Sequence, residues 1–145
     1  MIVVVTDTSG LLAALDQTHP DGEAARKVLR HAGMLVVPPG LLSELDHAAR
    51  RVLGRAAAHQ AIDDIRRWVR AGRAVLPEMT ADILDTAQAV RARYLDLRLD
   101  LADAVNVALA AQFRTNALLT LDRRDFRAVR PLSDHDAFEL LPDDA

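Results

Sequence analysis

The sequence predicts an α/β domain with a mainly parallel central sheet and helices on both of its faces. The first observation is that short β-branched and aliphatic runs alternate with longer segments whose apolar residues have helical spacing, as in strand-helix-strand units. The second is that the chain has 145 residues, of which 50% are hydrophobic, enough for one substantial core. We therefore expect residues 1–145 to form a single domain.

The first half of the chain contains three expected strands and four expected helices. The strands are apolar runs that stop at turn or cap residues, such as the Asp-Thr-Ser-Gly after Thr6 and the two prolines after Val37. Glycines follow the second, third and fourth helices, as is common at helix ends. The strands are expected at residues 2–6, 34–37 and 74–76, and the helices are expected from Ser9 and over 21–31, 41–53 and 55–71.

In the second half of the chain, Thr80 is expected to cap a helix that runs to about Tyr94. The elements expected after it are a helix over 101–113, a strand over 117–121, a short turn over 123–127 and an edge strand over 138–141. Residues 142–145 are expected to be a disordered tail, because they are terminal. In a parallel sheet of this kind, ligands bind at the carboxyl ends of the strands.

The composition limits the chemistry that the protein can perform. It contains no cysteine, which excludes disulfides, thiolate nucleophiles and zinc-thiolate sites. The net charge is −3, without the strong basicity of many general nucleic-acid binders, so any contact with RNA must use a local patch. The apolar N-terminal run is too short for a signal peptide or a membrane span, and we expect a cytoplasmic protein without membrane association.

Two aspartates directly follow expected strands, at the edge of the sheet where ligands bind. Asp7 ends the run Val-Val-Thr-Asp, and Asp122 ends the run Leu-Thr-Leu-Asp. Each of them alone could be a helix N-cap, a position that favours aspartate. Asp100 and Asp103 add a third acidic position, on one face of a helix and within an apolar run. Carboxylates this close repel one another unless a cation joins them.

A carboxylate cluster without cysteine or paired histidines suits a hard, oxygen-binding cation. We therefore expect Mg²⁺ or Mn²⁺ as the cofactor rather than zinc. Such an ion can activate water and stabilise charge on a phosphodiester, which predicts phosphoryl transfer to water. Other hydrolases lack their motifs here, because there is no glycine-rich phosphate loop and Ser9 is not in a Gly-x-Ser-x-Gly setting.

Four segments contain acids in a fixed order along the chain. They are Val4 to Leu12 (VVTDTSGLL), Ser43 to Leu45 (SEL), Leu101 to Ala104 (LADA) and Leu119 to Phe126 (LTLDRRDF). In this order and context the chain resembles the PIN-domain ribonucleases, and in particular the VapC toxins, over nearly its whole length. The resemblance implies a PIN-like single domain. It also implies a catalytic site made of Asp7, Glu44, Asp103 and Asp122, with Asp7, Asp103 and Asp122 as metal ligands.

Hydroxyl groups are expected beside these acids. The resemblance implies that Thr6, Ser9 and Thr120 lie next to the site, and that Ser9 or Thr120 can orient a carboxylate or a water molecule. The role of Glu44 rests mainly on the resemblance, because a glutamate in a helix is ordinarily solvated.

Three further polar residues have roles that the sequence leaves open. Asp100 either extends the site or caps its own helix, since aspartate is a preferred capping residue. Asp125 is expected to support the ligands or to be structural. Asn106, one helical turn after Asp103, either binds water or substrate or is a buried polar residue with a backbone partner.

The resemblance implies an endoribonuclease toxin that hydrolyses phosphodiester bonds in a cellular RNA, typically tRNA or ribosomal RNA. It further implies a homodimer that a cognate VapB-type antitoxin holds inactive. Two alternatives stay open: a PIN-type nuclease with a housekeeping or DNA-directed role, and a non-catalytic binding module with a vestigial acid cluster. A phospho-accepting receiver domain also has aspartates at strand ends, but it needs a lysine late in the fold, and Lys27 is the only lysine here.

Overall fold

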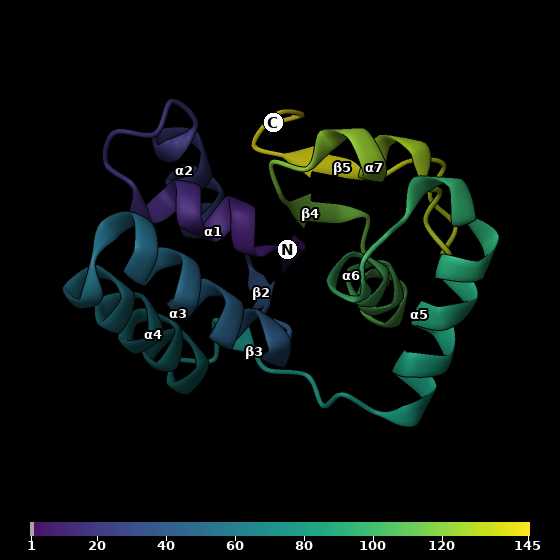
Figure 1. The fold of residues 1–145 in the computed structure, drawn as a ribbon, viewed down its shortest axis with the longest axis horizontal. Coiled ribbons are helices and arrows are strands. Elements are labelled where there is room, and N and C mark those ends of the chain that lie inside the picture. Colours follow the sequence, from purple (N-terminus) through teal and green to yellow (C-terminus); the bar gives the residue numbers. More distant parts are fainter. Residues whose placement is uncertain (1) are drawn as a thin grey trace.

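The computed structural model describes residues 2–145. Five parallel strands form one sheet in the order β3-β2-β1-β4-β5 (Figure 1). The strands are β1 (Val3–Thr6), β2 (Met34–Val36), β3 (Ala74–Val75), β4 (Ala117–Leu119) and β5 (Glu139–Leu141). Each lies within the run that the sequence indicated. The expected parallel sheet is therefore confirmed.

Helices connect the strands and lie on either side of the sheet (Figure 1). They are α1 (Thr8–Leu15), α2 (Gly22–His31), α3 (Pro39–Leu53), α4 (Arg55–Arg70), α5 (Ala81–Arg93), α6 (Leu101–Gln112) and α7 (Arg123–Ala128), with a 3-10 turn over Leu95–Leu97. None of the helices within residues 2–145 combines the length and the apolar character needed to cross a bilayer.

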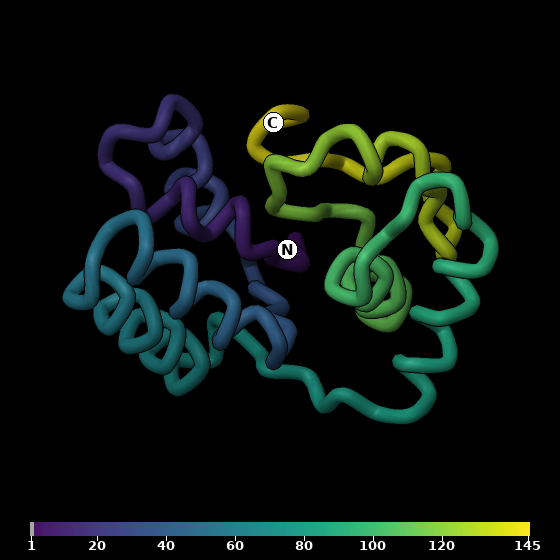
Figure 2. The backbone as a smooth tube through the Cα atoms, in the orientation of Figure 1, coloured from purple at the N-terminus to yellow at the C-terminus, as the bar shows by residue number. Residues whose placement is uncertain are grey.

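Two apolar cores lie on opposite faces of the sheet, because alternate strand residues point to opposite sides. On one face, Val4 and Leu119 pack with residues of α1, α3 and α4. On the other face, Val5 and Leu118 pack with residues of α5 and α6. Figure 2 shows the segment after β3 that carries the chain from the first helical layer to the second. Burial on both faces explains why the strands are uninterrupted apolar runs.

The strand order reverses at the centre of the sheet, between β1 and β4. The chain adds β2 and β3 on one side of β1 and then places β4 and β5 on its other side. At such a switch point the connections diverge, and ligands bind in the crevice beyond the carboxyl ends of the strands. The backbone N–H of Asp7 donates to the carbonyl of Leu119 at 3.0 Å, so the two strand ends lie side by side.

The segment after β4 differs from its expected form. The sequence predicts a short turn over 123–127, whereas Arg123–Ala128 forms the helix α7. This helix is too short to show a helical period in the sequence. Its anchor is Phe126, which is fully buried and meets Phe138 edge to face, with 6.1 Å between the ring centroids.

The last four residues also differ from expectation, because 142–145 form a turn after β5 rather than a disordered tail. Pro142 is buried. The carboxylate of Asp144 accepts the backbone N–H of Leu140 at 2.7 Å and two hydrogen bonds from the guanidinium of Arg127. These bonds attach the turn to α7.

Candidate active site

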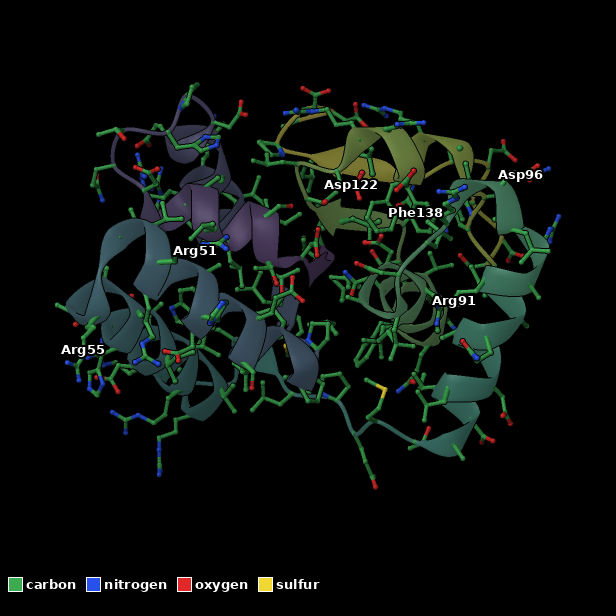
Figure 3. All side chains as sticks on the ribbon, viewed as in Figure 1. Arg51, Arg55, Arg91, Asp96, Asp122 and Phe138 are labelled. Carbon is green, nitrogen blue, oxygen red and sulfur yellow. The ribbon has the colours of Figure 1, made fainter. Side chains whose placement is uncertain are left out.

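Four aspartates gather at the carboxyl ends of β1 and β4. Asp7 directly follows β1, and Asp122 lies where β4 leads into α7, as Figure 3 shows. Asp103 is in the first turn of α6 and Asp125 is in the first turn of α7. One carboxylate oxygen from each of Asp103, Asp122 and Asp125 lies within 4.8 Å of the other two. The switch point of the sheet therefore brings Asp7, Asp103 and Asp122 together with Asp125. Glu44, the fourth acid of the expected catalytic set, is not among these converging carboxylates.

The hydrogen bonds distinguish an aspartate that caps its helix from two aspartates that do not. Asp7 and Asp122 occupy the N-cap positions of α1 and α7, but neither side chain makes a capping hydrogen bond. Asp100 does cap its helix, because it accepts the backbone N–H of Asp103 at 2.8 Å. Asp100 therefore caps its helix, and its negative charge also acts on Asp103 and Asp122.

Two hydroxyl groups orient the carboxylate of Asp7. Thr120 donates to Asp7 Oδ2 at 2.8 Å, and Ser9 donates to the same oxygen at 3.1 Å. Both hydroxyl oxygens also accept a backbone N–H, that of Leu121 for Ser9 and that of Asp122 for Thr120. The two hydroxyl oxygens are 3.3 Å apart, and the carboxylate oxygen Oδ2 of Asp7 lies within hydrogen-bonding distance of both.

Thr6 has a different role from these two residues. It is fully buried, and its hydroxyl donates to the carbonyl of Val36 at 2.9 Å. This bond ties the carboxyl end of β1 to that of β2. Thr6 therefore fixes the carboxyl end of β1, which Asp7 directly follows. Its hydroxyl group donates to a backbone carbonyl and not to an acid.

Asp103 has the most strongly shifted pKa of the cluster. Burial, as the largest cause, acts together with neighbouring negative charge to raise the pKa of this carboxyl group to about 8. Negative charge on Asp100, Asp7 and Asp122 adds to the effect. Without a cation, the cluster therefore keeps a proton that an ordinary aspartate has lost at neutral pH.

The pKa values of the two strand-end aspartates are raised as well. Burial raises the pKa of Asp7, although the hydrogen bonds from Thr120 and Ser9 act in the opposite direction. Burial also raises the pKa of Asp122, and the neighbouring charge of Asp125 is the next cause. All of these shifts reflect negative charge that is partly withdrawn from water.

In the part of the chain that the structure describes, the metal-ligand candidates have no basic partner. Within residues 2–145, no arginine, lysine or histidine forms an ion pair with Asp7, Asp103 or Asp122. Arg123 follows Asp122 in the sequence but reaches Asp21 and Asp143 instead, at 3.5 and 3.4 Å. Convergent carboxylate oxygens without a basic partner are the donor set that Mg²⁺ and Mn²⁺ prefer.

A pocket of about 280 Å³ adjoins the cluster. Asp7 lines it together with Glu44 of α3 and Asn106 of α6. Glu44 is exposed to solvent, whereas only 3% of the surface of Asn106 is accessible. A larger cavity of about 430 Å³ lies between α1, α2 and α4, but it contains none of the expected site residues.

A model of the PIN domain matches residues 4–131 of the chain, a range that includes all four clustered aspartates. The chain belongs to the PIN-domain family. This PIN domain is also similar to Ribonuclease VapC26 of Mycobacterium tuberculosis, with 36% identity over 130 residues, which are 89% of this chain and 93% of the relative. The PIN domain is therefore a nuclease of the VapC type.

Two solved structures share the PIN fold. VapC20 of Mycobacterium tuberculosis, described as a sarcin-ricin loop cleaving toxin, matches with a TM-score of 0.72 and 17% identity over 86% of this chain and 94% of that one. VapBC2 of Rickettsia felis, bound to a DNA fragment from its promoter, matches with a TM-score of 0.66 and 13% identity over 96% and 98%. At these identities the likeness concerns the fold alone.

The expected polar residues of the PIN domain lie at one end of the sheet, but only some of them belong to the acid cluster or bond to it. Those in or bonded to the acid cluster are Asp7, Ser9, Asp100, Asp103, Thr120, Asp122 and Asp125. Glu44 and Asn106 line the adjoining pocket instead. The sequence did not indicate the apolar walls of that pocket, Pro38 and Met79. They come from connecting segments, which carry no periodic signal.

Proposed function

We propose that the aspartate cluster of this PIN domain hydrolyses phosphodiester bonds in a cellular RNA with a divalent cation, Mg²⁺ or Mn²⁺. The observation that carries the proposal is the convergence of oxygens from Asp103, Asp122 and Asp125 within 4.8 Å without a basic partner. VapC-type nuclease activity agrees with this chemistry. A bound cation would supply charge that activates water and offsets the negative charge of the phosphate.

Asp7, Asp103 and Asp122 are the proposed ligands, and Asp125 lies close enough to assist them. Both hydroxyl donors of Asp7 use its Oδ2 atom, which leaves Oδ1 for a cation. Ser9 and Thr120 act by orienting this carboxylate, as outer residues of metal sites commonly do. Glu44, on the pocket side of Asp7, is proposed to accept a hydrogen bond from the attacking water or from the substrate.

We further propose that the RNA is a tRNA or a ribosomal RNA and that the protein acts as a toxin. One structurally similar protein is described as cleaving the sarcin-ricin loop, and another pairs with a VapB partner. The proposed partners are a VapB-type antitoxin and a second copy of this chain. An arginine from the antitoxin would pair well with the aspartates, because its planar fork matches a carboxylate.

A cleavage assay with purified protein tests the enzymatic proposal. Cellular RNA should be cut with Mg²⁺ or Mn²⁺ and left intact in excess chelator, and Asp103→Asn should abolish cutting. The matched control is Asp85→Asn, which removes one negative charge from an exposed position on α5 and should leave activity unchanged. Cleavage that persists in chelator and in the Asp103→Asn variant would exclude the proposed mechanism. The same RNA sequence made as DNA distinguishes ribonuclease from deoxyribonuclease activity.

Expression in bacteria tests the biological role. Without an antitoxin, the protein should arrest growth, and Asp103→Asn should relieve the arrest while the variant remains soluble. A soluble variant that is still fully toxic would separate toxicity from the aspartate cluster.

A further inference from the structure

The side chain of Asn106 is largely buried, yet it forms no hydrogen bond with another side chain or with the backbone of residues 2–145. Only 3% of its surface is accessible. The amide is nevertheless not sealed in the core, because Asn106 lines the pocket of about 280 Å³ that adjoins Asp7. Arg123 Nε is the one side-chain N or O atom within residues 2–145 that is fully enclosed and lacks a hydrogen bond, so the amide atoms of Asn106 remain accessible from the pocket. They are available to bind a polar group there.

The other walls of the pocket are mostly apolar. They include Pro38, Met79, Leu101 and Val105, which come from two connecting segments and from α6. The volume is slightly below the lower end of the usual range for small-molecule sites, which is about 300 Å³. The pocket therefore suits one small group with apolar surface and a polar edge rather than a longer segment of substrate.

Asp7 connects this pocket to the acid cluster. It lines the pocket together with Asn106, and the hydroxyl of Thr120 links its carboxylate to the backbone N–H of Asp122, at 2.8 and 3.0 Å. A nucleotide whose phosphate lay at the cluster would therefore have a neighbouring base within reach of the pocket.

We propose that the pocket receives an unpaired base of the RNA beside the cleaved phosphate, and that Asn106 determines which base is accepted. This inference rests on the proposed function. Proteins that recognise single-stranded RNA bind splayed bases through apolar contacts and hydrogen bonds to the base edges. The asparagine amide offers a donor and an acceptor side by side, which matches N7 and N6 of adenine. Adenine is the expected base.

The test is a cleavage assay on a pool of RNA molecules of random sequence, with the cut ends sequenced. The native protein with Mn²⁺ should favour one base at one position beside the cut, by about 5- to 100-fold, as expected for a good amide-base pair. Asn106→Ala should abolish this preference at that position only. Asn106→Ser serves as a second variant that keeps a small polar group. Leu101→Ala removes a partly exposed apolar wall and should weaken cleavage at all bases alike.

Measuring Mn²⁺ binding shows whether Asn106 acts on the base or on the metal. Asn106→Ala should bind Mn²⁺ as the native protein does, whereas Asp103→Asn should not. An unchanged base preference in Asn106→Ala would overturn the inference and leave the nuclease proposal intact. A preference lost together with Mn²⁺ binding would also overturn it, because Asn106 would then act on the metal.

Binding of short homopolymeric RNA tests the pocket even if the native protein cuts nothing. Fluorescence anisotropy with tetranucleotides of A, C, G and U in chelator should show discrimination that Asn106→Ala removes. If cleavage is absent and this discrimination is present, the proposed function fails and the base site stands. If the native protein binds all four tetranucleotides alike, the pocket holds water rather than a base and the inference fails.

Discussion

Two threonines at opposite ends of β4 make the same kinds of hydrogen bond to different partners. Thr120, at the carboxyl end, donates to Asp7 and accepts the backbone N–H of Asp122. Thr115, at the amino end, donates to the carbonyl of Val3 and accepts the backbone N–H of Ala117. Removing either hydroxyl group should affect stability, but only Thr120 touches the acid cluster.

We expect Thr120→Val to weaken Mn²⁺ binding and cleavage by roughly 10- to 100-fold, the usual effect of losing a residue that orients a metal ligand. The control is Thr115→Val, which should lower the melting temperature by a similar amount and leave Mn²⁺ affinity unchanged. Calorimetric titration with Mn²⁺ and thermal melts of both variants measure the difference. Equal affinities in the two variants would show that Thr120 is only structural.

Asp103→Asn should leave the metal-free protein as stable as the native protein or more so, because it relieves repulsion at the site with the most strongly raised pKa. Added metal should raise the melting temperature of the native protein but not that of Asp103→Asn. A ligand at ten times its dissociation constant adds about 1.4 kcal/mol, which raises the melting temperature by roughly 3 to 6 °C for a chain of this length. Thermal melts in chelator and with Mn²⁺ should show this rise for the native protein only. A variant that melts far lower in chelator would make Asp103 a structural residue.

The sequence could predict that aspartates follow the strands, but it could not predict which of them cap helices. Asp7, Asp100 and Asp122 all precede a helix, and aspartate is favoured there in every case. What distinguishes them is whether the carboxylate reaches a backbone N–H, and that depends on side-chain direction. The direction of a side chain cannot be inferred from the sequence pattern. Asp100 meets such a partner, whereas Asp7 is held by two hydroxyl groups from other elements.

At the scale of elements, the close contact of α1 with β4 depends on Gly10. A Cβ atom at Gly10 would lie 2.6 Å from the carbonyl oxygen of Leu119 and 2.7 Å from its Cγ atom. A side chain there would therefore push α1 away from β4. Because Ser9 belongs to α1 and bonds to residues that follow β4, the acid cluster would lose its alignment as well.

We expect Gly10→Ala to destabilise the protein by about 1 to 3 kcal/mol, the typical cost of overpacking, and to weaken Mn²⁺ binding. Gly40→Ala is the matched control, because Gly40 also lies in a helix and a Cβ atom there meets nothing within 4 Å. The control should be as stable as the native protein or slightly more so, since alanine favours helices. Denaturant unfolding measures both effects, and similar stabilities of the two variants would contradict this account of the helix-strand contact.

The strands were predictable because burial on both faces requires uninterrupted apolar runs, and β1 and β4 show this plainly. The helix α7 could not be predicted, because its position depends on one buried residue, Phe126, and on the contact of that residue with Phe138. A single anchor gives no periodic pattern. Likewise, the turn at residues 142–145 depends on an ion pair between Arg127 and Asp144, whose partners are far apart in the sequence.

At the scale of the whole molecule, the acid cluster makes stability depend on pH. The pKa of Asp103 is about 8 in the folded protein and 3.8 when unperturbed. Between these values the folded chain holds a proton that the unfolded chain has released. The contribution of Asp103 to stability is therefore complete below about pH 4 and is lost as the pH rises through about 8. The raised pKa values of Asp7 and Asp122 act in the same direction.

In chelator, the free energy of unfolding should fall as the pH rises from about 5 to about 8, and Asp103→Asn should reduce this slope. Urea unfolding across this range provides the measurement. With Mn²⁺ the trend should reverse, because the cation competes with protons for the same oxygens and binds more tightly as they leave. Stability in chelator that does not depend on pH in this range would mean that the aspartates are less crowded than the structure indicates.

The order of the strands in the sheet also fixes when the acid cluster can form during synthesis. Asp7 is synthesised before β4, the strand that pairs with β1, and Asp122 and Asp125 are synthesised after β4. A nascent chain, or a product of premature termination before Asp122, lacks two of the four aspartates. Until β4 and the two aspartates after it have been synthesised, the cluster is therefore incomplete, and the nuclease activity proposed for it cannot begin.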